Sequence, residues 1–333
     1  MDLSAIIIVL AKLLFLMIVG YVLNRTKVLD SRGNKAVSAL LVNATNPALV
    51  IGAMAATEGV ARDQVMKVIL LGIAIYILLP LMAFLIVRLL HIDLKKRGTA
   101  QLLLIFGNTG FMAIPVLQTL YGDVSVFYCN IMNLPFNFLI YSYGVYLLSK
   151  DAARQREEIG EGSETSGGSG TAASGKAPGG FSWKLFLSPG ILASALALIM
   201  YFTQIRLPAA VSDTLLYLGN CTPPLSMLIL GSVLAEFPLK SVFADLKINL
   251  MLLIKLLLMP VLILLMAKLI FTDPVIIGIA TLTFAMPCGT MCAILSKDKG
   301  GDTMTASGGV VFSTVISMIT IPIVYMLLGP FFG

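Results

Sequence analysis

Hydrophobic positions in this chain gather into ten long apolar segments that are separated by shorter polar stretches. Most segments are close to the roughly 20 residues that an α-helix needs to cross a bilayer. The pattern therefore predicts an all-α polytopic membrane protein with ten transmembrane helices. The expected helices span residues 5–23, 36–56, 66–90, 99–121, 125–148, 186–204, 212–233, 246–270, 274–296 and 304–328.

One polar stretch is longer than the others and differs in kind. Between Asp151 and Gly180 the chain is rich in Gly, Ser and Glu and has almost no apolar residue. Such a stretch buries too little surface to offset the entropy of ordering it, so it is expected to be a flexible linker. The linker, residues 149–185, divides the chain into two units of five helices, residues 1–148 and 186–333.

The two units resemble each other in sequence. Asn43 and Pro47 of the second segment align with Asn220 and Pro224 of the seventh at an offset of 177 residues, and a second echo links segments four and nine at an offset of 179. Because each unit has an odd number of helices, the second unit enters the membrane from the opposite side. The chain is therefore predicted to be a 5+5 inverted repeat, as in many secondary transporters. We expect the four repeated residues to form kinks that shape the interface between scaffold helices.

Segments four and nine also contain helix-breaking residues at matched places. Gly110 and Pro115 lie in the fourth, and Pro287 and Gly289 lie in the ninth. Proline removes a backbone donor and glycine loosens the chain. Interrupted helices in corresponding positions are the best sequence indication of a binding site at the membrane midplane. The alternative is a pair of ordinary proline kinks.

Composition removes several classes of function. The chain is 58% hydrophobic and 12% charged, with a mean hydropathy of +0.95, which excludes a soluble enzyme. One His and four Cys give little material for a metal site, so neither a metal nor a cofactor is expected. The net charge of +6 does not indicate a nucleic-acid partner, because basic loops are usual on the cytoplasmic side of a membrane protein.

Basic residues predict the orientation. Loops after even-numbered segments hold only Arg62, Lys67, Arg206 and Lys268, whereas most of the 23 Lys and Arg lie in loops after odd-numbered segments. The positive-inside rule then places both termini outside and the linker in the cytoplasm, as a multi-pass protein of the cytoplasmic membrane.

A few polar side chains remain within the segments. Asn133 and Asn137 belong to an amide stripe on one face of the fifth helix, where they either face a substrate or bond neighbouring helices. Lys255 lies deep in the eighth segment, where it either attracts an anion or satisfies carbonyls freed at a helix break. Lys12 is close enough to the membrane surface to extend toward it. No Asp or Glu lies in the interior of a segment.

The run GNTGFMAIPVLQTLYGD at residues 107–123 resembles the fourth-helix signature of the auxin efflux carrier family. The short loops are similar to those of the bacterial branch, often described as malate or malonate permeases. The resemblance implies a fold shared with bile-acid symporters and sodium/proton antiporters. In that fold the fourth and ninth helices cross in a mobile transport domain, beside a scaffold of the first, second, sixth and seventh. It also implies that Asn108, Pro115 and Pro287 lie at the crossing, and that the protein is a homodimer.

Together these features predict a secondary transporter of small organic anions, such as a dicarboxylate or an indole-type acid, that works by an elevator movement. The residues expected to bind the substrate are Asn108, Thr109, Asn133, Asn137, Lys255 and Thr290. A sodium- or proton-coupled carrier on the same fold is the alternative. An intramembrane enzyme is disfavoured because the helices offer no His and no interior acid. A receptor that binds without transporting would also fit the fold.

Overall fold

The computed structural model describes residues 3–158, 189–236 and 245–329, which form helices joined by turns. The first part contains α1 (Leu3–Arg25), α2 (Ser31–Leu40), η1 (Leu41–Thr45), α3 (Asn46–Gly52), η2 (Ala53–Thr57), α4 (Arg62–Leu89), α5 (Arg97–Ile105), η3 (Thr109–Ala113), α6 (Ile114–Tyr121), α7 (Val124–Met132), α8 (Leu134–Leu139), η4 (Ile140–Gly144) and α9 (Val145–Glu158). The second part contains α10 (Pro189–Thr203), α11 (Ala209–Gly219), α12 (Thr222–Glu236), α13 (Leu246–Ile270), α14 (Pro274–Phe284), α15 (Thr290–Lys299) and α16 (Thr303–Leu328). The predicted all-α class is confirmed.

Six helical stretches of the described residues are long and apolar enough to cross a bilayer. They are Ile7–Arg25, Arg62–Leu89, Val124–Arg156, Ala209–Glu236, Leu246–Ile270 and Thr303–Leu328. They coincide with the first, third, fifth, seventh, eighth and tenth predicted segments. The second segment is wound as α2 to η2 with a π-helical turn inside it, and the fourth and ninth are broken. The sixth begins in the described chain at Pro189.

Aspartate side chains mark where several helices start. Asp30, Asp245, Asp273 and Asp302 precede α2, α13, α14 and α16, and each accepts a bond from a backbone N–H of the first turn at 2.8 to 3.1 Å. An N-terminal carboxylate satisfies a donor that the helix leaves free and interacts favourably with the helix dipole. Three of these caps explain why the apolar helices α13, α14 and α16 begin directly after an aspartate.

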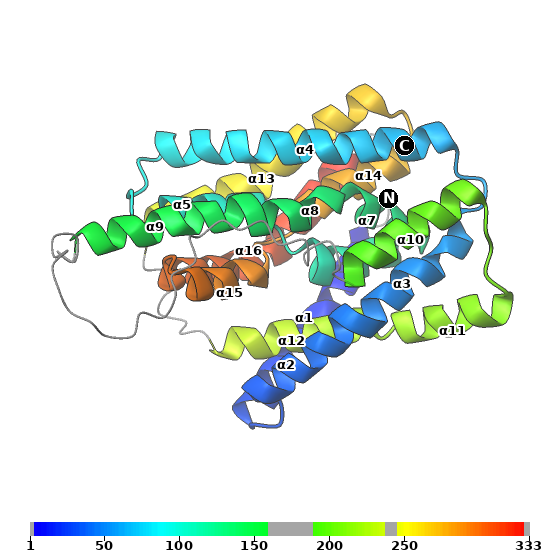
Figure 1. Cartoon of the computed structure of the whole chain (residues 1–333), viewed down its shortest axis with the longest axis horizontal. Helices are drawn as coiled ribbons and strands as arrows, with labels where there is room; N and C mark the ends of the chain where they lie inside the picture. The colour runs from blue at the N-terminus through cyan, green and yellow to red at the C-terminus, as the bar shows by residue number, and fades with distance from the viewer. Residues whose placement is uncertain (1–2, 159–188, 237–244, 330–333) are drawn as a thin grey trace, which may run out of the picture.

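The outermost layers of the molecule are well separated. Figure 1 shows α4 along one side and α2 with α12 along the opposite side, with α5, α16 and α15 between them. Glycines allow α1 and α12 to touch through their backbones, because a Cβ atom at Gly20 would overlap Leu228 and one at Gly231 would overlap Met17. In the view of Figure 1, α5 and α15, which are pieces of the two broken helices, thus lie between the outer helices.

The second and seventh apolar segments also meet directly. The Thr222 hydroxyl donates to the Thr45 hydroxyl at 2.9 Å, and both side chains are buried. A Cβ at Gly219 would lie 2.5 Å from Leu49 Cα, so α3 and α11 are in backbone contact. Thr45 and Thr222 are separated by the same 177 residues that relate the two units in sequence.

The start of the predicted linker differs from expectation. Residues 149–158 continue α9 instead of leaving it. Asp151 is fully buried there and accepts bonds from Gly98 N at 2.8 Å, Thr99 N at 2.7 Å and Thr99 Oγ1 at 2.9 Å. The carboxylate caps the N-terminus of α5, which holds the extra helical turns against the bundle. The remainder of the linker, residues 159–185, lies outside the described residues.

Candidate functional site

The fourth apolar segment breaks between α5 and η3. Helix α5 ends at Ile105, and the backbone of Phe106 is extended (φ −102°, ψ 101°). Asn108 then starts the next helical piece, because its Oδ1 accepts a bond from Phe111 N at 3.2 Å. Asparagine favours this capping position over a helix interior. The local sequence Gly107-Asn108 therefore accounts for the break.

The ninth segment breaks between α14 and α15. Helix α14 ends at Phe284 and α15 begins at Thr290. Pro287 lies in the gap, where its missing N–H costs nothing because no helical bond is made. Gly289 allows close approach, since a Cβ there would lie 3.1 Å from the carbonyl oxygen of Gly107.

The two breaks pair with each other. Asn108 N donates to Pro287 O at 2.7 Å, and Gly289 N donates to Phe106 O at 3.0 Å. Gly107 and Cys288 form the isolated antiparallel bridge between them. Backbone groups that leave a helix at membrane depth need a partner from the protein or from a cavity. Each break supplies part of what the other lacks, so the two interrupted segments are held together at this crossing.

Two predicted break residues lie away from the crossing itself. Pro115 is the second residue of α6, where a proline is tolerated in the first turn of a helix. Gly110 lies within the π-helical turn η3, with open space where a Cβ would be. The break in the fourth segment is thus earlier than Pro115 suggested, because Gly107 and Asn108 open the chain first.

Lys255 lies behind the crossing. Its side chain is 3% exposed, and Nζ donates to Leu103 O at 2.7 Å and lies 3.4 Å from Cys288 Sγ. Leu103 belongs to the last turn of α5, whose carbonyls lose their helical donors at the break. Of the two roles expected for Lys255, the structure supports the satisfaction of a freed carbonyl. Lys12, by contrast, is exposed on α1.

A cavity of about 280 Å³ borders the crossing. Its walls come from both helix breaks, from the α7–η4 region, and from η1–α3 with the start of α10. The predicted residues that line it are Asn108, Thr109, Gly110, Asn133, Asn137, Gly289 and Thr290. Lys255, Pro115 and Pro287 do not line it, and no charged side chain among the described residues does.

Hydrogen-bond donors are concentrated on the crossing side of this cavity. Thr109 and Thr290 are the first residues of η3 and α15, so the N-termini of two helical pieces border the same space. The first N–H groups of a helix have no partner within it and carry a partial positive charge. Asn108 is 4% exposed, and its Nδ2 has no hydrogen-bond partner among the described residues.

The asparagines of the fifth segment were expected either to face a substrate or to bond neighbouring helices, and two of them, Asn130 and Asn133, both line the cavity and make hydrogen bonds within the bundle. Asn133 Nδ2 donates to Cys129 O at 2.8 Å, and its Oδ1 accepts from the Tyr76 hydroxyl at 2.6 Å, which ties α7 to α4. Asn130 bonds back to Val126 O at 2.7 Å. Asn133 and Asn130 therefore have bonding partners within the bundle, although both also line the cavity.

The repeated residues of the second and seventh segments lie at turns and helix starts. Asn43 is exposed and bonds back to Ala39 O at 2.7 Å. Pro47 and Pro224 lie in the first turns of α3 and α12. Asn220 ends α11, and its Oδ1 accepts from Gln118 Nε2 at 3.1 Å. None of these four lines the cavity at the crossing.

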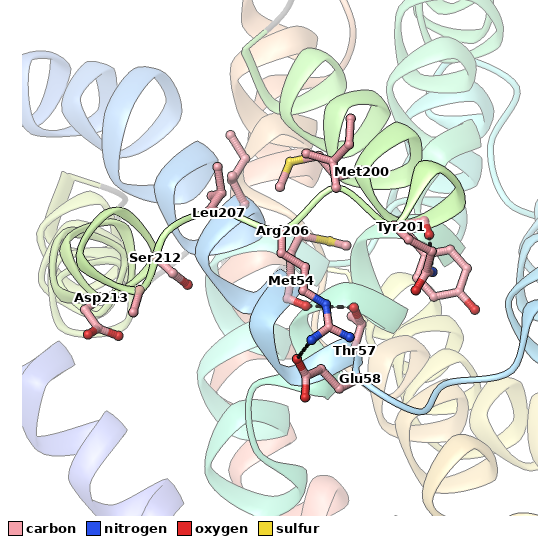
Figure 2. Close-up of a pocket in the computed structure, with 13 residues that line it drawn as sticks. Met54, Thr57, Glu58, Met200, Tyr201, Arg206, Leu207, Ser212 and Asp213 are labelled. Atoms are coloured by element: carbon pink, nitrogen blue, oxygen red, sulfur yellow. Dashed lines mark hydrogen bonds and ion pairs between the residues drawn. The ribbon is translucent and has the colours of Figure 1, made fainter.

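A second cavity, of about 270 Å³, lies at the ends of α3, α10 and α11. Figure 2 shows Arg206 reaching Glu58 across it, with Nη1 and Oε1 2.7 Å apart. Both side chains are mostly exposed, at 71% and 64%. Such an ion pair contributes little to stability. The residues of this cavity are distinct from those of the crossing.

Two relevant residues were not identified from the sequence. Asn46 lines the crossing cavity, one turn beyond the predicted Asn43. Asp151 is a buried acid at the end of the fifth helix. The sequence could have indicated Asn46, because it is a further polar residue in an apolar segment. Only the packing of the helices shows that Asn46, and not Asn43, faces the cavity.

Comparison with known families extends these observations. The sequence model of the family described as "Membrane transport protein" matches residues 5–325, nearly the whole chain. A search of curated proteins finds no match.

Proposed function

The chain belongs to the auxin efflux carrier family of membrane transport proteins, and we propose that it carries small organic anions that bind in the cavity at the crossing of the fourth and ninth helices. It is a transporter and not an enzyme, as its family shows. The substrate class and the mechanism below are our proposal.

The observation that carries the proposal is the chemistry of the cavity wall. Two helix N-termini and the unpartnered Nδ2 of Asn108 are all donors, and none of the described residues that line the space carries a carboxylate to repel an anion. Helix N-termini bind carboxylate and phosphate groups in many proteins. We propose that the substrate carboxylate lies against Asn108, Thr109 and Thr290, with its body toward Asn137 and the opposite wall.

The arrangement of the helices supports an elevator movement. The cavity lies between η1–α3 with α10 on one side and the two helix breaks on the other. We propose that α4 to α9 and α13 to α16 move as one unit against α1 to η2 and α10 to α12.

The bond between Thr45 and Thr222 supports an inverted repeat, because a two-fold axis brings equivalent residues of the two units together. The family resemblance further supports a homodimer.

The cavity favours a state that is open to the cytoplasm. It extends to Gly190 and Ile191 at the start of α10, which follows the linker that we propose to be cytoplasmic. Toward the opposite surface, Gln118 bonds Asn220 at 3.1 Å and the rings of Phe127 and Tyr201 are 5.5 Å apart. We propose that these contacts close the outer path between the two groups of helices.

Asn108→Asp provides the sharpest test. The aspartate keeps an oxygen to cap Phe111 N, so the helix start is retained, but it replaces a donor with an anion. We expect uptake of a carboxylate panel into proteoliposomes at pH 8 to fall about 10-fold or more, since a hydrogen bond to a charged group is worth about 1.5–3 kcal/mol. Asn108→Ala should lower the uptake in the same way, because it removes the same donor.

The matched control is Asn43→Ala, because Asn43 bonds only within its own helix and lies outside the cavity. It should transport as the wild type does. Unchanged uptake by both Asn108 variants would refute the site, and the absence of uptake of every acid by the wild type would refute the proposed substrate class.

A further inference from the structure

The cavity of about 270 Å³ at the ends of α3, α10 and α11 has no part in the proposed transport site. It lies beside two turns, residues 58–61 and 204–208, which connect the second with the third and the sixth with the seventh predicted segment. We therefore expect it to open at a surface of the bilayer. Its volume is close to the lower end of the range for ligand pockets, about 300–1,000 Å³, so it fits a small group rather than a large molecule.

Charges of both signs border this cavity. Glu58 and Asp213 contribute carboxylates, and Arg206 contributes a guanidinium group. The ion pair engages Nη1 of Arg206 with Oε1 of Glu58, so the other guanidinium donors and Oε2 remain for a ligand. Asp213 makes no hydrogen bond or ion pair with a described residue. The wall thus offers partners for an anion and for a cation, with one acid in excess.

Ser212 adds a buried hydroxyl to the same wall. It is 8% exposed, and its hydroxyl bonds no described residue. Figure 2 shows Ser212 on α11 and Arg206 beside Glu58 near the end of α3, so polar groups border the cavity from two helices. The Thr57 hydroxyl, by contrast, already donates to Met54 O at 2.7 Å. A buried hydroxyl without a partner is unfavourable, so we expect a polar group of a ligand beside Ser212.

Apolar side chains complete the wall and continue to the outside of the bundle. The cavity is lined by Ile51, Met54, Met200, Ile205 and Leu207. Ile205 is 58% exposed, so apolar surface leads from the cavity to the outer face of the helices. A molecule with a charged head and hydrocarbon chains covers both kinds of surface, whereas a wholly polar solute would leave the apolar part in contact with water.

An ethanolamine head group matches these features better than a choline or a glycerol head group. An ammonium group has three donors, which suit the two carboxylates and the Ser212 hydroxyl, and the phosphate suits Arg206. Choline has no N–H and is recognised by cages of aromatic rings, but Tyr201 is the one aromatic side chain among the described residues of this wall. An anionic glycerol head group would meet two carboxylates and only one guanidinium.

We propose that this cavity binds an ethanolamine phospholipid of the surrounding membrane. Its phosphate lies against Arg206, its ammonium group lies against the carboxylates and Ser212, and its acyl chains follow the apolar surface past Ile205. The exposed ion pair between Arg206 and Glu58 contributes little to stability, so its groups can turn to the lipid at little cost. The site does not depend on which substrate the protein transports.

Three phospholipids with the same acyl chains test the site: dioleoyl phosphatidylethanolamine, phosphatidylcholine and phosphatidylglycerol. Their dissociation constants for the delipidated full-length protein in detergent can be measured by native mass spectrometry. The ethanolamine lipid should bind the wild type about 10-fold more tightly than either of the others, because only its head group donates hydrogen bonds to the carboxylates from a cation. Glycerophosphoethanolamine, which lacks the chains, should bind at least about 10-fold more weakly than the lipid.

Two variants separate the partners of the head group. Glu58→Gln combined with Asp213→Asn removes both carboxylates with little change in shape, so the ratio of ethanolamine to choline affinity should fall close to 1 and phosphatidylglycerol should bind more tightly. Arg206→Ala should weaken the ethanolamine and choline lipids alike, by about 3- to 10-fold, because both carry the phosphate. Asp63→Asn is the matched control, since Asp63 is an exposed acid that pairs with Lys67 outside the cavity.

Equal binding of the three lipids by the wild type would overturn the proposal, as would a preference for the ethanolamine lipid that persists in the double variant. Loss of the preference in Asp63→Asn would also overturn it, because surface charge in general would then be responsible. Glycerophosphoethanolamine that binds as tightly as the lipid would show that the ligand is a free zwitterion and would overturn the assignment to a lipid. None of these results bears on the proposed transport of organic anions.

Discussion

Backbone contact between α3 and α11 gives a stability prediction that can be worked out from one glycine. A Cβ at Gly219 would lie 2.5 Å from Leu49 Cα and 2.7 Å from Leu49 N. Carbon atoms pack best about 3.5–4.0 Å apart, so Gly219→Ala requires the helices to separate by about 1 Å. Backbone atoms cannot rotate away, which places the overpacking penalty near the upper end of the usual range, about 3 kcal/mol.

Alanine also favours the helical state by about 1 kcal/mol relative to glycine, which leaves a net loss of about 2 kcal/mol. We expect Gly219→Ala to lower the melting temperature by about 5 °C in detergent. Unfolding can be followed with a thiol-reactive fluorophore, because Cys129, Cys288 and Cys292 are buried. In Gly190→Ala the added Cβ meets no atom within 4 Å, so that variant should melt at or above the wild-type temperature. Equal melting of the two variants would refute the backbone contact.

Two further predictions concern buried polar groups. Asp151→Ala removes three hydrogen bonds at the start of α5, including both bonds to Thr99, and should lower the free energy of unfolding by about 2–4 kcal/mol. The control Glu58→Ala should change the free energy of unfolding by less than about 1 kcal/mol, because the ion pair of Glu58 is exposed. Similar melting temperatures for these two variants would contradict this assignment. A double-mutant cycle of Thr45→Val and Thr222→Val should give a coupling of about 0.6 kcal/mol, the mean for hydrogen bonds between membrane helices, and additive effects would show that the two hydroxyls do not interact.

Local chemistry made much of the fold predictable. Apolar runs of sufficient length specify membrane helices, and aspartates at their starts supply the caps. The break of the ninth helix is visible because Pro287 cannot donate a bond, whatever surrounds it. In the fourth helix Asn108 does lie at the break, whereas Pro115 lies in the first turn of α6, because a proline is compatible with a helix start.

The site was only partly predictable, because its residues depend on which groups pair across the bundle. Asn108, Thr109 and Thr290 follow from the breaks and do line the cavity. Lys255 looked equally suitable in the sequence, yet its ammonium group is bound to Leu103 O behind the crossing. Asn46 was overlooked, because only the packed structure shows that it lines the cavity and that Asn43 does not.

The sequence by itself determined the membrane environment, the helical class and the places where the chain cannot remain helical, since each depends on the transfer of apolar groups or on the backbone chemistry of single residues. Only the tertiary structure decided that Phe106 to Asn108 pairs with Pro287 to Gly289, and which polar groups this leaves unpaired. Hydrogen bonds between segments about 180 residues apart have no local signature. A buried donor or acceptor is available to a substrate only when no other part of the fold has satisfied it.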